Sequence, residues 1–77
     1  MSLHWRDAYP EYSEAQLSGK ALAGARDREG LTQMQLSEIT GIPQRHISEM
    51  ENGKRPIGKE MAKRLAKALN IGYKVFL

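Results

Sequence analysis

Cysteine is absent from this 77-residue sequence, and aromatic residues are few, with one tryptophan, one phenylalanine and three tyrosines. Without cysteine, neither disulfides nor thiolate metal sites can hold the fold together. The two histidines, His4 and His46, are too few for a structural zinc site, so we expect no metal and no cofactor. A chain of this length lies near the lower limit for a domain without such staples. Its stability is therefore expected to come from helix packing, alone or with a partner subunit.

Long hydrophobic runs are missing as well. No apolar stretch approaches the ~20 residues of a membrane span, and no signal-peptide pattern is present. We therefore expect a soluble, cytoplasmic protein with no membrane partner.

Basic residues are concentrated in the second half of the chain, although the net charge is only +3. Between positions 44 and 67 the sequence has seven basic residues against three glutamates: Arg45, Lys54, Arg55, Lys59, Lys63, Arg64 and Lys67 against Glu49, Glu51 and Glu60. Alone, such a run is more typical of a solvated helix surface than of a binding site. Beside a nucleic-acid-binding motif, it is the charge pattern expected of a phosphate-binding face.

Residues 32–52 predict two short helices joined by a glycine turn. Thr32 and Gln35 have the spacing of a capping box, which starts the first helix. Gly41 can take the left-handed conformation that ends it, and Pro43 suits the first turn of the second helix. This arrangement is typical of a helix-turn-helix motif.

The second helix of this motif is expected to have two different faces. Ile47 and Met50 lie one turn apart and are expected to point inward. The opposite face, expected to stand in solvent, carries Gln44, Arg45, Ser48 and Glu49.

The rest of the chain predicts an all-α fold of four helices with a short C-terminal tail. Residues 1–12 have no clear period and are interpreted as an N-terminal arm, followed by a single domain over 13–77. Further helices are expected over about 14–29 and 59–69, and Gly19 and Gly24 are expected to mark close helix contacts. The tail at 71–77 predicts either a short strand or a last irregular turn. We hypothesise that it is buried on both sides, across a dimer interface.

The motif resembles the phage repressor and Cro type of helix-turn-helix, the XRE-like family with a lambda-repressor-like fold. The matching positions span about residues 17–69: Arg26, Gly30-Leu31-Thr32-Gln33, Leu36, Gly41-Ile42, Ile47-Ser48, Glu51-Asn52-Gly53-Lys54 and Pro56. Two residues depart from the family pattern. Ser37 replaces a usual alanine, and Pro43 replaces a usual serine or threonine, which removes a side-chain cap from the second helix.

The resemblance implies which residues contact DNA. Base edges would be read from Pro43, Gln44, Arg45 and Glu49, and phosphates would be bound by Gln33, His46, Ser48, Lys54 and Arg55. Glutamine can pair with adenine and arginine with guanine, so the chemistry of positions 44 and 45 agrees with this role. The resemblance also implies a partly buried ion pair between Arg26 and Glu51.

We therefore expect sequence-specific binding of double-stranded DNA by a transcriptional regulator, and within that class a nucleoid-associated repressor acting as a homodimer. One alternative is an antitoxin-like autorepressor that also binds a toxin protein. Another is a protein-binding scaffold that does not bind DNA. An enzyme is not expected, because a chain of 77 residues has few residues with which to line a substrate cleft. The glycines also do not have the spacing of a phosphate-binding loop.

Overall fold

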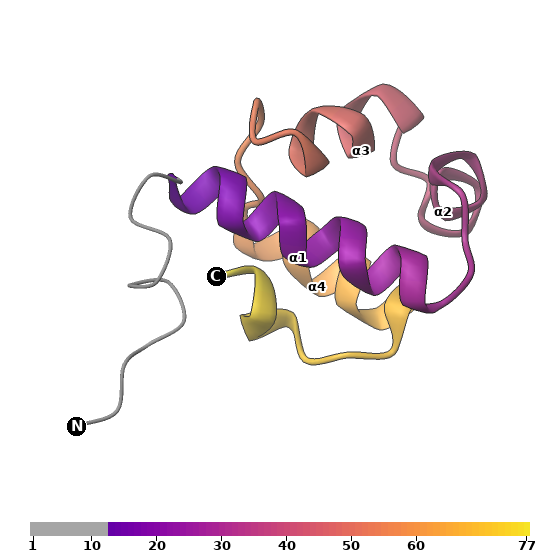
Figure 1. Ribbon diagram of the computed structural model, residues 1–77. Coiled ribbons are helices and arrows are strands. Elements are labelled where there is room, and N and C mark those ends of the chain that lie inside the picture. The colour runs from indigo at the N-terminus through magenta and orange to yellow at the C-terminus, as the bar shows by residue number, and fades with distance from the viewer. Residues whose placement is uncertain (1–12) are drawn as a thin grey trace.

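The computed structural model describes residues 13–77, so the expected arm at 1–12 lies outside the described residues. The described part contains helices α1 (Glu14–Arg28), α2 (Gln33–Thr40), α3 (Gln44–Glu51) and α4 (Lys59–Leu69), then a 3₁₀ helix, η2 (Tyr73–Phe76), and no strand. In Figure 1, α1 crosses the middle of the molecule, with α3 on one side and α4 and the tail on the other. The all-α prediction with four helices is confirmed. None of the helices described could cross a membrane.

Capping boxes start both α1 and α2, and the one at Thr32 lies where the sequence predicts it. Ser13 Oγ accepts a hydrogen bond from the Gln16 amide at 3.2 Å, and the Gln16 side chain accepts one from the Ser13 amide at 2.8 Å. Thr32 and Gln35 make the same reciprocal pair at 3.0 and 2.8 Å. Each box satisfies two amides that would otherwise lack partners at a helix N-terminus.

The corner between α2 and α3 is built from Gly41 and its neighbours. Gly41 has a φ of 74°, and its amide donates to the Ser37 carbonyl at 2.8 Å, which ends α2. The Ser37 hydroxyl donates to the Ile42 carbonyl at 2.6 Å, a bond that the alanine usual in the family could not make. Pro43 is the residue before α3 and gives it no side-chain cap. It therefore lies just outside the helix rather than in the first turn, where the sequence pattern had placed it.

The core lies between the helices, and all of the described helices contribute to it. Its largest fully buried side chains come from every helix and from the corner between α2 and α3: Leu22, Leu36, Ile42, Ile47, Met50, Leu65, Leu69 and Phe76. Gly19 permits the closest approach, because a Cβ there would lie 2.3 Å from the Met50 carbonyl oxygen in α3. The expectation for Gly24 is wrong: it is exposed on the outer side of α1, and a Cβ there would meet nothing within 4 Å.

The tail folds back over α1 and α4 as the 3₁₀ helix η2, so the strand alternative is wrong. Phe76 enters the core, and its carbonyl accepts a hydrogen bond from the buried Ser18 hydroxyl at 3.0 Å. A 3₁₀ turn can direct Phe76 inward while its neighbours face outward, whereas a strand would need a partner edge. Val75 and Leu77 are exposed, by 49% and 47%, so the tail is not buried on both sides within one chain.

Candidate nucleic-acid interface

Helix α3 has one buried and one outer face. Ile47 and Met50 are fully buried, as the sequence predicts. Pro43 and the first two residues of α3, Gln44 and Arg45, are exposed, and the Arg45 side chain is 82% exposed. The N-terminal end of α3 therefore presents polar side chains of the kind that match base edges.

The second turn of α3 is less exposed than the sequence pattern indicates, because its polar groups have partners within the protein. Ser48 and Glu49 are half-buried. The Asn52 side chain donates to the Ser48 carbonyl at 2.8 Å and approaches its hydroxyl at 3.5 Å. Both residues, expected on the solvent face, are therefore only partly exposed.

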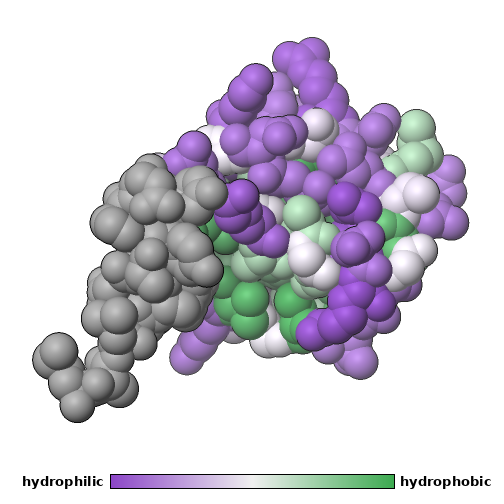
Figure 2. Space-filling model, viewed as in Figure 1, coloured by the Kyte–Doolittle hydropathy of each residue, from purple (hydrophilic) through white to green (hydrophobic). Residues whose placement is uncertain are grey.

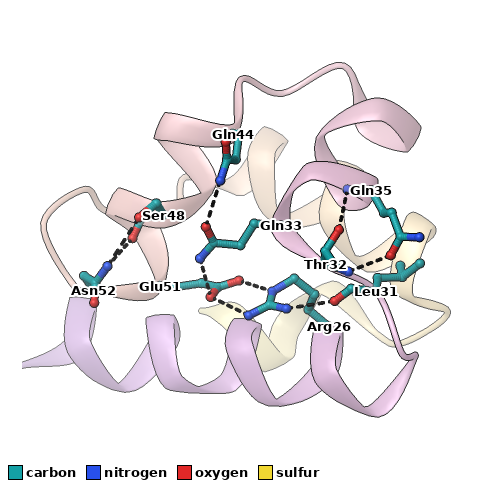
Figure 3. A network of polar contacts seen from close by, with 9 residues as sticks. All are labelled: Arg26, Leu31, Thr32, Gln33, Gln35, Gln44, Ser48, Glu51 and Asn52. Carbon is teal, nitrogen blue, oxygen red and sulfur yellow. Dashed lines mark hydrogen bonds and ion pairs between the residues drawn. The ribbon is translucent and has the colours of Figure 1, made fainter.

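A chain of polar contacts links the interior of the domain to the first residue of α3 (Figure 3). The Arg26 guanidinium donates to both oxygens of Glu51, at 2.6 and 3.0 Å, and to the Leu31 carbonyl at 2.8 Å. The side chains of Arg26 and Glu51 are only 18% and 7% exposed, so this ion pair joins α1 to the end of α3 with little screening. The hydrogen bond from Arg26 to Glu51 raises the pKa of the arginine.

Gln33 continues this chain toward the outer face. Its amide nitrogen donates to Glu51 Oε1 at 3.0 Å, and its amide oxygen accepts from the Gln44 side chain at 3.4 Å. The Gln33 side chain is thus held between the ion pair and α3, and it restricts the Gln44 side chain (Figure 3). Its predicted phosphate role would therefore use mainly its backbone amide. The capping box leaves the amides of Gln33 and Met34 without an intrahelical partner, and such amides favour anions.

Glu49 binds two arginines, one within α3 and one in the loop that follows it. Its Oε1 accepts a hydrogen bond from Arg55 Nε at 3.0 Å, and its Oε2 lies 3.6 Å from Arg45 Nε. The hydrogen bond from Arg55 is the main reason that the pKa of Glu49 lies below its usual value, and the charge of Arg45 adds to the effect. The carboxylate is therefore occupied by arginines in the free protein.

The other expected phosphate-binding residues differ in exposure. Lys54 is exposed, while His46 and Arg55 are half-buried. Arg55 reaches back to α3 through Glu49, so the loop after α3 lies beside the outer face of that helix. The structure thus brings Arg45, Glu49 and Arg55 together.

A helix-turn-helix family model, HTH_3, matches residues 22–76, which is most of the chain. The chain belongs to this family of XRE-type, DNA-binding transcriptional regulators. The matched region contains all of the ion-pair, α2 and α3 residues discussed above. No curated protein matches the chain in sequence.

Solved structures of two bacterial regulators are similar to this HTH_3 domain. The restriction-modification controller protein C.AhdI from Aeromonas hydrophila is 26% identical, with a TM-score of 0.79 over 86% of this chain and 100% of that one. The clp gene regulator ClgR from Corynebacterium glutamicum is 26% identical, with a TM-score of 0.78 over 84% of this chain and 69% of that one. These likenesses support the expected fold class.

Five of the seven basic residues in the basic stretch lie in three separate places, which the linear pattern does not reveal. Arg45 and Arg55 meet at Glu49. The Lys63 ammonium lies 5.5 Å from the centre of the Tyr73 ring, against the tail. Arg64 and Lys67 line a hollow beside the end of α2. These five residues therefore do not form one continuous basic surface, and Arg45 and Arg55 are the two that meet at α3.

Sequence reasoning missed Arg55 as a partner of Glu49 and Gln33 as a second partner of Glu51. Glu49 and Arg55 are six residues apart across the end of α3, a spacing with no helical period, so no local pattern indicates their contact. The bond from Gln33 to Glu51 joins residues 18 positions apart and depends on how α2 packs against α3. Within the described residues, no group of three or more His, Asp or Glu side chains could hold a metal ion.

Proposed function

We propose that this HTH_3 domain binds a specific double-stranded DNA sequence through the outer face of α3 and represses transcription. The observation that carries the proposal is the pair Gln44 and Arg45, which is exposed at the start of α3 while Ile47 and Met50 on the opposite face are fully buried. The names of C.AhdI and ClgR describe a controller and a gene regulator, which supports a regulatory role.

Base reading is assigned to Pro43, Gln44 and Arg45, with Glu49 one turn further along. A glutamine can donate to and accept from the major-groove edge of adenine, and an arginine can donate twice to guanine. Gln44 is held by Gln33, so it loses less side-chain freedom on binding than an unrestrained glutamine would. Pro43, directly before these residues, can contact a base only through its apolar ring.

Phosphate contacts are assigned to groups around this pair. The free amides at the start of α2, which include that of Gln33, favour an anion. The side chains of His46, Ser48, Lys54 and Arg55 lie on α3 or on the loop after it. Such contacts position the domain on the duplex without reading its sequence.

We also propose that the domain acts as a homodimer at the nucleoid. A single α3 of eight residues offers few base contacts, whereas two copies on a palindromic site would double them. Figure 2 shows hydrophobic atoms gathered toward the lower part of the visible face, where the tail lies in Figure 1. Val75 and Leu77 of the tail are among the exposed large hydrophobic residues, which suits contact with a second copy.

The test is a selection of bound duplexes from a random pool, followed by binding measurements at several salt concentrations. We expect a shared, palindromic motif to be enriched, and affinity to fall steeply with salt because phosphate binding releases counterions. A pool that remains random after repeated rounds, with no retention of any duplex at low salt, would contradict the proposal and favour a protein-binding scaffold. Co-purification of a toxin protein would instead favour the antitoxin-like alternative.

A further inference from the structure

The carboxylate of Glu49 lies at the centre of the proposed DNA-binding face, between two arginines. Arg55 Nε is 3.0 Å from one oxygen and Arg45 Nε is 3.6 Å from the other. Both of these contacts are made through the arginine Nε atoms. Glu49 thus reduces the charge of this group of three residues from +2 to +1, while the side chains of Arg45 and Arg55 remain 82% and 41% exposed.

This geometry makes base reading by Glu49 itself the weaker interpretation. To accept from a cytosine amino group, the carboxylate would have to turn from Arg55 and Arg45 toward the groove. Its side chain is 30% exposed, against 82% for Arg45, so Arg45 reaches further from the surface. The carboxylate is better placed to act on the two arginines than on a base.

We propose that Glu49 is a specificity-determining residue, which holds Arg45 and Arg55 and so weakens binding to non-cognate DNA. This inference rests on the proposed function. Binding to random DNA depends on phosphate neutralisation, which a local negative charge opposes at every sequence. At the cognate site, Arg45 also gains directional base contacts that offset the partial loss of its contact with Glu49. The carboxylate therefore lowers random affinity more than cognate affinity.

Glu49→Gln tests the inference because glutamine keeps the size of the side chain and removes its charge. The matched control is Glu38→Gln, which makes the same change of net charge at an exposed position on α2. For each protein, the affinity for the selected duplex and for a random duplex is measured by fluorescence anisotropy over a range of salt concentrations. Urea unfolding confirms that both variants are folded.

For Glu49→Gln, we expect tighter binding of random DNA and a salt slope steeper by about one unit, since one more phosphate contact is effective. The ratio of the variant's affinity for random DNA to that of the parent should then fall by about threefold to fourfold between 50 and 200 mM salt. The ratio of cognate to random affinity should fall. In a background with Arg55→Gln, the effect of Glu49→Gln should be smaller, because one of its two partners is gone.

Equal effects of Glu49→Gln and Glu38→Gln would overturn the inference, since only net charge would then matter. Weaker cognate binding with unchanged random binding would also overturn it and would assign Glu49 to base reading. If the parent binds DNA with steep salt dependence while either of these results is found, the proposed function stands and only this inference fails. If no protein binds any duplex, both fail.

Discussion

Glu51 is the residue on which the contact between α1 and α3 and the restraint of Gln44 both depend. Its carboxylate accepts from Arg26 through two nitrogens and from Gln33 through one. Burial of a charge is unfavourable unless such donors compensate for the lost water. The same carboxylate thus stabilises the fold and holds, through Gln33, the side chain proposed to read adenine.

Arg26→Ala is expected to lower the free energy of unfolding by about 3–5 kcal/mol, because it leaves the Glu51 carboxylate buried without its main partner. A domain this small has little more stability than that. Urea unfolding followed by circular dichroism measures the effect, with Arg28→Ala on the exposed side of α1 as the control. An unchanged unfolding midpoint for Arg26→Ala would contradict the role given to the ion pair.

Arg45→Ala and Lys54→Ala should separate base reading from phosphate binding. Loss of Arg45 should cost about 1–3 kcal/mol at the selected site and relax the preference at one base pair. Loss of Lys54 should weaken all duplexes alike and reduce the salt slope by about one unit. Binding titrations with cognate and random duplexes measure both. Equal losses on the two duplexes for Arg45→Ala would remove that residue from the reading role.

Many of these residues could be identified from the sequence, whereas most of their partners could not. Gln44 and Arg45 follow a glycine corner at fixed spacing, so their exposure at the start of a helix was predictable. The pairing of Arg26 with Glu51 joins residues 25 positions apart, so no local pattern indicates it. It was expected only because of the family resemblance. The bond between Glu49 and Arg55 depends on the path of the loop after α3, which no periodicity describes.

At the scale of helices, local signals determine where each element begins and ends. The Ser13 and Thr32 capping boxes and the left-handed Gly41 are encoded within a few residues, so these helix ends could be predicted. Helix packing is encoded less locally. Gly19 and Gly24 both lie within α1, yet only Gly19 packs against α3, although both were expected to mark close helix contacts.

The two glycines provide a matched pair of substitutions. Gly19→Ala should destabilise the domain, because the new Cβ would lie 2.3 Å from the Met50 carbonyl oxygen and α1 would have to move away from α3. Gly24→Ala meets nothing within 4 Å and should stabilise by up to about 1 kcal/mol, the helix-propensity difference between the two residues. Thermal unfolding of both variants compares the two changes. Shifts of the same sign would contradict the assigned packing.

At the scale of the whole molecule, the tail completes the core and also provides an exposed hydrophobic surface. Phe76 is buried and Ser18 binds its carbonyl, while Val75 and Leu77 face outward. The sequence pattern of alternating apolar residues suggested a strand because it does not show which residue reaches the core. The site that Phe76 fills exists only when α1 and α4 are folded, so the linear pattern does not show it.

The double substitution Val75→Ser with Leu77→Ser should convert a dimer into a monomer without removing Phe76 from the core. Light scattering coupled to gel filtration measures the mass, and circular dichroism checks the fold. Met34→Ser, at another exposed hydrophobic residue on α2, is the control and should leave the mass unchanged. A dimer mass that persists in the double variant would place the interface elsewhere, and a monomeric parent would contradict the proposed dimer.

Mapping of amide chemical shifts, with a selected duplex added to the labelled protein, tests the central claim most directly. We predict that the largest changes occur at the start of α2 and along α3, including Gln33, Gln44 and Arg45, and at Lys54 and Arg55 in the following loop. Amides on the outer side of α1, such as that of Gly24, should change little. Changes concentrated on α1 or on the tail, with α3 unaffected, would contradict the proposal that the outer face of α3 meets DNA.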